Sequence, residues 1–178
     1  TALLSFKDVQ DGHSLKGVVL DLRDNPGGLL EEAAKIVSLF VPKGSTVVST
    51  RAKLTEWEST TRTSTQPLDT LVKIAVLINR NSASASEIMA GALQDNDRGL
   101  VVGRRSFGKG LLQKQIYLPD SSAIRLTIAR YYTPSHRCIQ KDYTLGDEDD
   151  YSTELIDRYS HGELYSADSI KVDKSKIF

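Results

Sequence analysis

Three serines alternate with alanines ahead of an apolar stretch, and the middle serine, Ser84, has the surroundings of a nucleophile. It lies three residues before Glu87, which is the S-x-x-E spacing of a capping box, and apolar residues follow at helical spacing. A helix that begins there places the Ser84 hydroxyl at its positive end, where developing negative charge is stabilised. The same spacing also fits a serine that only caps a helix, so both interpretations stay open.

The candidate base is a lysine between two glycines, Lys109, which follows one predicted strand later. None of the three histidines lies in a motif that suggests a Ser-His-Asp triad. A Ser-Lys pair is the other route, since a lysine can act as a general base when desolvation lowers its pKa. Gln113 is placed to hold the Lys109 amine if a strand begins near that lysine. Taken singly, Lys109 also fits a solvated turn residue, and Gln113 fits an ordinary polar strand residue.

Four stretches of the chain resemble, in the same order, the catalytic core of the C-terminal processing peptidases, also called tail-specific proteases. They are GVVLDLRDNPGG (17–28), SASASEIMAGALQD (82–95), VVGRRSFGKGLLQ (101–113) and LTIARYYTPS (126–135). The resemblance implies a serine endopeptidase with a Ser-Lys dyad that processes polypeptides from or near their C-termini. In that enzyme Ser84 is the nucleophile, Lys109 is the general base and Gln113 orients the lysine.

The resemblance also assigns the groups around the dyad. The family's oxyanion hole uses the amide after the nucleophile, here Ala85, and an amide of the NPGG loop, here Gly27 or Gly28. Glycines suit such a loop because they let an amide approach a substrate carbonyl. Asp95, at the end of the expected helix, falls on a position interpreted as structural support. The sequence departs from the family pattern at His136, where the family often has glycine. This departure puts the local turn in question but not the dyad.

The elements that must position these residues predict an α/β fold. Strand, glycine turn and helix follow one another at 17–40, and a continuous apolar run at 71–79 leads to Ser84. Two alternating strands joined by a PDSS turn occupy 115–134, and the polar segment 55–69 is either a loop or a solvated hairpin. Repeated strand-helix-strand units predict parallel pairing. The resemblance implies a crotonase/Clp-protease-like core with a mixed, partly parallel sheet and flanking helices.

Length and composition fit one globular domain with an extension. The chain has 178 residues, no net charge and 39% apolar residues. Residues 1–140 are expected to form the serine protease catalytic core, and 141–178 a polar C-terminal extension with one short helix near 153–159. The single cysteine, Cys138, excludes an internal disulfide and a Cys-rich zinc site. We expect no metal, no cofactor and no nucleic-acid partner.

The resemblance implies the partners and the compartment. Polypeptide substrates bind in extended form by adding a strand to a sheet edge. The family has a PDZ domain ahead of the catalytic core, which this sequence does not contain, so we expect a fragment of a longer parent chain whose activity in isolation is not assumed. A homo-oligomer is left open. The sequence shows no signal peptide, and a bacterial cell-envelope or periplasmic location follows from the resemblance alone.

Two other functions compete with the peptidase. The segment GRRSFGKG (103–110) matches G-x-x-x-x-G-K of a phosphate-binding loop, but Gly110 stands where that loop needs Ser or Thr for magnesium. A strand is also predicted after it, where the phosphate-binding loop continues as a helix. The second alternative is a non-catalytic peptide-binding module of the same fold. The intact set of Ser84, Lys109 and Gln113 favours the enzyme.

Overall fold

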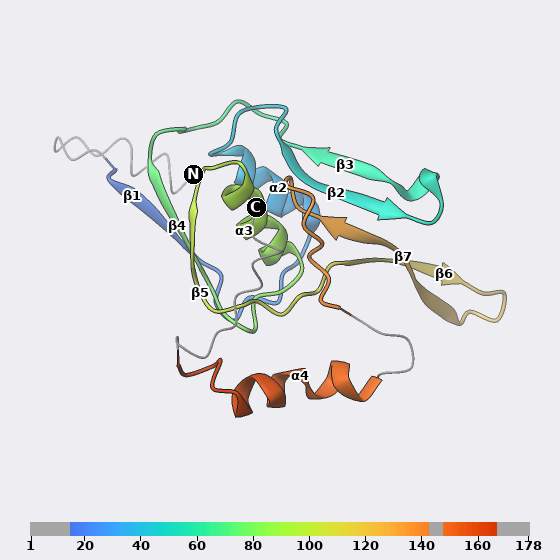
Figure 1. Cartoon of the computed structure of the whole chain (residues 1–178). Coiled ribbons are helices and arrows are strands. Elements are labelled where there is room, and N and C mark those ends of the chain that lie inside the picture. Colours follow the sequence, from blue (N-terminus) through green and yellow to red (C-terminus); the bar gives the residue numbers. More distant parts are fainter. Residues whose placement is uncertain (1–14, 143–147, 167–178) are drawn as a thin grey trace. The chain divides into compact units, whose positions relative to one another are not determined.

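The computed structural model describes residues 15–142 and 148–166, and these residues fall into two compact units that divide after Gln140. The first unit contains every candidate site residue and consists of two sheets with two helices between them (Figure 1). Among the described residues, no helix has the length and apolar character needed to cross a membrane.

One sheet is parallel and brings two loops together. It consists of β1 (Gly17–Asp21), β4 (Lys73–Ile78) and β5 (Leu100–Gly103) in the order β1-β4-β5. The central strand is β4, the continuous apolar run, and its Val76 is fully buried. Since parallel neighbours end at the same edge of a sheet, the loop after β1 and the loop that leads to Ser84 lie next to each other.

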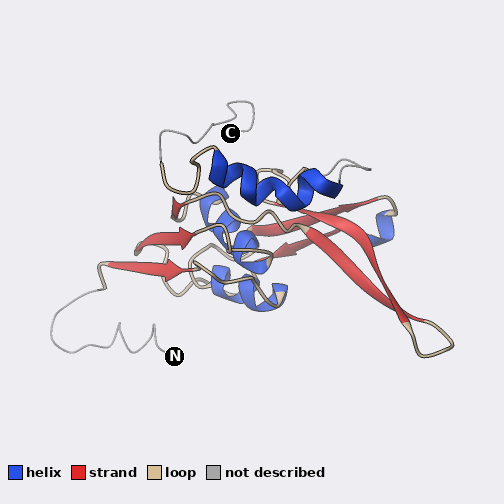
Figure 2. Cartoon of the chain, turned by 90° about the horizontal axis from the view of Figure 1, so that it is seen from below, coloured by secondary structure: helices blue, strands red, loops and turns tan. Residues whose placement is uncertain are grey.

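The second sheet is antiparallel and has the order β3-β2-β7-β6. Its strands are β2 (Thr46–Ala52), β3 (Ser59–Arg62), β6 (Leu111–Tyr117) and β7 (Ala123–Tyr132). The polar segment therefore forms the hairpin alternative, with the short 3-10 helix η1 (Thr55–Trp57) at its turn. The predicted hairpin β6–β7 is confirmed, although it begins earlier than expected, and its far end extends beyond β2 (Figure 2).

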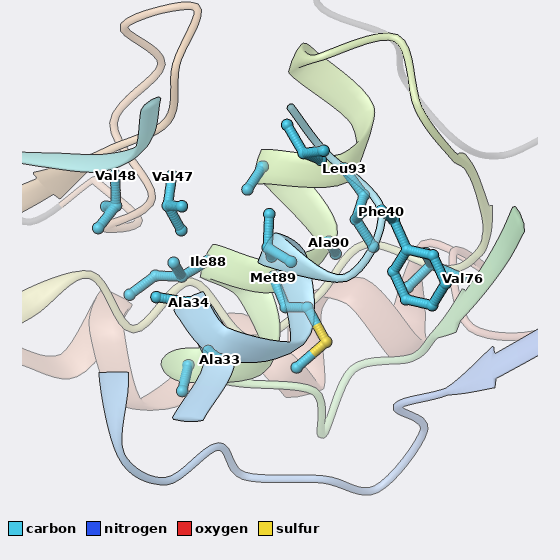
Figure 3. Packing of buried hydrophobic residues seen from close by; sticks show 14 of the residues in the cluster. Ala33, Ala34, Phe40, Val47, Val48, Val76, Ile88, Met89, Ala90 and Leu93 are labelled. Atoms are coloured by element: carbon cyan, nitrogen blue, oxygen red, sulfur yellow. The ribbon is translucent and has the colours of Figure 1, made fainter. Parts of the chain in front are cut away.

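The helices α2 (Leu30–Ser38) and α3 (Ala85–Asp95) pack between the sheets. In α2 one face is buried, whereas Ala85–Leu93 of α3 are all buried, as expected for a helix that is apolar on every side. Figure 3 shows the resulting core. Its labelled members come from both helices, from both sheets and from the end of α2: Ala33, Ala34, Phe40, Val47, Val48, Val76, Ile88, Met89, Ala90 and Leu93. The predicted mixed α/β class is confirmed.

The second unit contains the helix α4 (Glu148–Ser160), which is longer than the short helix predicted near 153–159. An ion pair between Lys141 and Glu154, at 2.5 Å, joins the start of this unit to the helix. The remaining parts of the predicted extension, 143–147 and 167–178, lie outside the described residues.

Truncation of Leu93 tests the packing of α3. Leu93 is fully buried, so Leu93→Ala should lower the free energy of unfolding by about 2–5 kcal/mol through lost apolar contact and a residual cavity. The control is Leu100→Ala, since Leu100 is 69% exposed and its truncation should cost below about 0.5 kcal/mol. Urea unfolding of both variants measures the difference, and equal effects would contradict this core.

Candidate active site

The backbone of Ser84 has a conformation that few residues with a side chain adopt. It lies between β4 and α3 with φ 56° and ψ −119°. Such conformations cost on the order of 1–3 kcal/mol and persist only where the surrounding structure holds them. Ser84 is also the only residue in 82–93 that is not buried. A strained strand-to-helix turn that exposes one hydroxyl is the geometry of nucleophile elbows.

The predicted helix start is confirmed, because α3 begins at Ala85 and Glu87 reaches back to the residue before it. The Glu87 carboxylate accepts the backbone N–H of Ser84 at 2.9 Å. The capping interpretation is therefore correct, and it does not exclude a chemical role. The Ala85 N–H is the first of the amides that an α-helix leaves without an internal acceptor.

The same carboxylate connects the serine turn to the lysine loop. Oε2 of Glu87 accepts the N–H of Ser84 and, at 2.8 Å, the N–H of Lys109. Oε1 accepts the hydroxyl of Ser106 and the N–H of Gly108, both at 2.6 Å. Glu87 is only 7% exposed, and a buried carboxylate needs such donors to offset the loss of water. The backbones of Ser84 and Lys109 are thus linked through one shared carboxylate oxygen.

Both glycines beside Lys109 are required by the backbone. Gly108 has φ 88°, which disfavours any L side chain. At Gly110 a Cβ atom would lie 2.4 Å from the backbone nitrogen of Gln140, and the Gly110 N–H donates to the Gln140 side chain at 3.0 Å. The loop is therefore held on both sides of Lys109, while the Lys109 side chain itself is exposed.

These contacts exclude the phosphate-binding alternative. The amides of Gly108 and Lys109 point at the Glu87 carboxylate, which occupies the place where a phosphate would have to bind. The strand β6 then follows the loop, as predicted, whereas a phosphate-binding loop continues as a helix.

The NPGG loop packs directly against the serine. Gly27 has φ 96°, and a Cβ atom there would lie 2.8 Å from the Cβ of Ser84 and 2.7 Å from the nitrogen of Ala85. The Gly27 N–H donates to the side chain of Asn25 at 2.9 Å. Gly28 is exposed, and its N–H has no acceptor among the described residues. Gly27 therefore provides the close approach, and Gly28 provides the free amide.

Asp95 holds the turn after β7. Its carboxylate accepts the N–H and the hydroxyl of Ser135, at 3.1 and 2.6 Å, and pairs with the guanidinium of Arg137. Burial by itself would raise the pKa of Asp95, but hydrogen bonds from Ser135 and Thr133 and the charge of Arg137 together lower it. The end of α3 is thereby tied to the second sheet.

The structure brings the backbones of Ser84 and Lys109 together, but it does not join their side chains to each other or to that of Gln113. Within the described ranges, no hydrogen bond joins the Ser84 hydroxyl to the Lys109 amine. Gln113 lies opposite Thr127 in the hairpin, and its amide donates to the Thr127 hydroxyl at 3.5 Å. Its role in orienting Lys109 stays a prediction.

Asp21 and Arg23 form an exposed ion pair at the end of β1. Arg Nη2 and Nε donate to the two carboxylate oxygens at 2.6 and 2.9 Å. These hydrogen bonds lower the pKa of Asp21 to about 2. Exposed pairs of this kind contribute little to stability.

Sequence reasoning missed the wider role of Glu87, which it treated only as the partner in a capping box. The available signal was a carboxylate inside an otherwise apolar helix, since glutamate is almost never fully buried without a partner. What the sequence did not contain was the identity of the other donors, Ser106 and Gly108, which come from a separate segment.

Together these groups have the parts needed for acyl transfer. Ser84 offers a partly exposed hydroxyl, the amides of Ala85 and Gly28 offer two donors for an oxyanion, and Lys109 offers an amine on the adjoining loop. These are the groups that a serine hydrolase uses.

Comparison with known families agrees with this class. The model of peptidase family S41 matches residues 3–152, and the chain therefore belongs to that family. The carboxy-terminal-processing protease of Bartonella bacilliformis is 48% identical over 139 residues, which are 76% of this chain and 32% of that protein. The carboxyl-terminal-processing protease of a Synechocystis species is 46% identical over 132 residues, 74% of this chain and 30% of that protein.

A solved structure shows the same likeness. The photosystem II D1 C-terminal processing protease superposes with a TM-score of 0.65 at 38% sequence identity. The match covers 70% of this chain and 32% of that structure. The chain thus spans about a third of the length of the relatives that it matches.

Glu87→Gln tests the link between the serine turn and the lysine loop. An NH₂ group at Oε2 leaves the N–H groups of Ser84 and Lys109 without an acceptor, whereas one at Oε1 leaves the N–H of Gly108 without one, because the Ser106 hydroxyl can turn to accept. Each N–H left unsatisfied should cost about 1–3 kcal/mol of folding stability. Hydrogen exchange should accelerate at the amides of Ser84 and Lys109 or at that of Gly108. Glu31→Gln, at an exposed position of α2, is the matched control. Unchanged exchange at all three amides would contradict the shared carboxylate.

Asp95→Asn tests the ties to the turn after β7. Because the pKa of Asp95 is lowered in the folded state, its ionised form stabilises the fold above the unfolded pKa, and this contribution disappears as the pH falls through the folded pKa. The melting temperature of the variant should be lower than that of the parent near neutral pH, and the gap should close below about pH 4. Asp97→Asn, at an exposed position, is the control, and a gap for Asp95→Asn that does not change with pH would contradict the assignment.

Proposed function

We propose that the chain is the catalytic core of a serine endopeptidase that processes polypeptides from or near their C-termini, with Ser84 as nucleophile and Lys109 as general base. The single observation that carries this proposal is the Glu87 carboxylate, which binds the backbones of both residues at once. The strained backbone and the partly exposed side chain of Ser84 support the same role. Membership of peptidase family S41 and the likeness to carboxy-terminal-processing proteases support the kind of substrate.

The reaction is a two-step acyl transfer. The Ser84 oxygen attacks the scissile carbonyl carbon while its proton passes to the neutral Lys109 amine. The amides of Ala85 and Gly28 donate to the oxyanion. When the tetrahedral species collapses, the C–N bond breaks, the leaving amine takes the proton from Lys109, and an ester remains on Ser84. Water then gives a proton to Lys109 and attacks the ester. The acid is released as the Ser84 oxygen takes that proton from Lys109, which restores the hydroxyl and the neutral amine.

Substrate completes the environment of Lys109. The Lys109 side chain is exposed in the structure, whereas a lysine acts as a general base where it is shielded from water. An extended polypeptide that lies over Ser84 covers the amine, excludes water and favours its neutral form. Gln113, on β6 beside it, then holds the amine. Among the described residues β6 is an edge strand of its sheet, and we assign the added strand to its free side.

The other parts of the proposal rest on the family resemblance and on the fact that the chain spans only about a third of its relatives. We include in the proposal a crotonase/Clp-protease-like arrangement of the core and the division into a catalytic part, 1–140, and a polar extension, 141–178. A PDZ domain of the parent chain, assembly as a homo-oligomer and a location in the bacterial cell envelope or periplasm belong to the proposal in the same way. No metal or other cofactor takes part in it.

Alanine substitution of the dyad tests the function. On the full-length protein, Ser84→Ala and Lys109→Ala should each slow cleavage of an unfolded polypeptide by at least about 10³-fold, because the nucleophile or its base is lost. Lys43→Ala, at an exposed lysine in the loop between α2 and β2, should cleave like the parent. Cleavage is followed by gel electrophoresis and mass spectrometry of the products. If both dyad variants cleave like the parent, a non-catalytic peptide-binding module becomes the better interpretation of this fold.

A further inference from the structure

A cluster of polar side chains joins the loops that follow β1 and β4. Its members are Asp24, in the first loop, and Asn79 and Asn81, in the second. The Nδ2 groups of Asn79 and Asn81 donate to one oxygen of Asp24, Oδ1, at 2.9 and 2.7 Å. In return the Asp24 N–H donates to Oδ1 of Asn79 at 3.0 Å. Three hydrogen bonds therefore meet at Asp24 and cross between the two loops.

Backbone contacts extend the same connection toward the serine. The Ser82 hydroxyl accepts the N–H of Asn79 at 2.9 Å and donates to the carbonyl of Leu22 at 2.7 Å. The Ala83 N–H donates to the carbonyl of Asn25 at 3.0 Å. The residue before the candidate nucleophile is thus bound to the residue after Asp24.

The backbone of Asp24 has an unfavourable conformation although its side chain is not packed in the core. Its φ is 59°, a left-handed value that aspartate and asparagine adopt more readily than other residues with a side chain. Its side chain is exposed, so burial does not explain the conformation. What distinguishes Asp24 is that hydrogen bonds from Asn79 and Asn81 hold it in this conformation.

The loop that Asp24 holds carries the second half of the proposed oxyanion hole. Gly27 presses against Ser84 and Ala85, and Gly28 presents the amide without an acceptor. An oxyanion hole works only when two N–H groups point at one oxygen at about 2.7–3.1 Å. The distance between the amides of Ala85 and Gly28 therefore depends on how firmly the two loops are joined.

We propose that Asp24, with Asn79 and Asn81, is the positioning device of the oxyanion hole and holds the Gly28 amide in line with the Ala85 amide. The inference rests on the proposed function of Ser84. Asp24 touches neither the substrate nor the reacting atoms and acts through the loop that it holds. The side-chain chemistry is specific, because a single acceptor oxygen takes both amide groups.

That single acceptor makes a discriminating pair of variants available. Asp24→Asn keeps an oxygen for both Nδ2 groups and tolerates the positive φ, so it should cleave within a few-fold of the parent. Asp24→Gly relieves the strain at this φ but removes the acceptor, so only the hydrogen bonds are lost. Asp97→Gly is the matched control, since Asp97 is an exposed aspartate with φ 53° in the turn after α3.

The experiment measures kcat and KM of the full-length protein on a cleavable peptide. Asp24→Gly should lower kcat by about 10²–10³-fold, the loss found when an oxyanion donor is removed, while KM stays unchanged. A peptide aldehyde, which adds to the serine as a tetrahedral adduct, should bind Asp24→Gly more weakly by a similar factor. The product peptide should bind both forms equally. A role in stability alone would leave these ratios unchanged in folded protein.

The outcomes separate this inference from the function on which it rests. If Ser84→Ala is inactive but Asp24→Gly keeps the parental kcat, the inference is overturned and the function stands. If Ser84→Ala cleaves like the parent, the function fails and the inference fails with it. Equal losses in Asp24→Asn and Asp24→Gly would also overturn it, since the acceptor would then be irrelevant. Should Asp24→Gly not fold, Asn81→Ala removes one donor and should give a smaller loss of kcat at unchanged KM, whereas a parental kcat would overturn the inference.

Discussion

The buried carboxylate of Glu87 is the interaction on which the rest of the site depends. A charge that leaves water must be met by hydrogen-bond donors, and here the donors come from the serine turn and from the loop 106–109. Because each carboxylate oxygen accepts two of them, a shift of either segment would leave a buried charge partly unsatisfied. The cost of that state holds the two segments together. Glu87 thus converts a local helix cap into a long-range constraint.

Parallel pairing of β1 and β4 supplies the second constraint. It places the NPGG loop beside the turn at Ser84, where a side chain larger than hydrogen at Gly27 would collide with the serine backbone. Ser84 and Asp24, one in each loop, both have positive φ. His136 is a further case: the turn after β7 has φ 65° at this residue, where the resemblance led us to expect glycine. The turn nevertheless forms, and Asp95 binds it through Ser135.

The site divides into a preformed part and a part that awaits substrate. The backbone around Ser84, Gly28 and Lys109 is held by hydrogen bonds that do not involve a ligand. The side chains of Lys109 and Gln113 are exposed. This division is physically reasonable, because a lysine that is neutral in water is costly to maintain, whereas a substrate that covers it changes its surroundings only when catalysis is needed.

The sequence by itself determined the main strands of the core, the helix α2, the start of α3 after Ser84 and the glycines around Lys109, because periodicity, caps and turns depend on near neighbours in the chain. It left 55–69 open as a loop or a hairpin and predicted α4 too short. Only the tertiary structure decided that Glu87 binds the lysine loop, that Gly28 has the free amide and that Gln113 meets Thr127. It also revealed the link between Asp24 and the two asparagines. These contacts join residues that are far apart in sequence. They depend on the register between strands and on which donors the fold places within hydrogen-bond distance of an acceptor. No local sequence pattern encodes either.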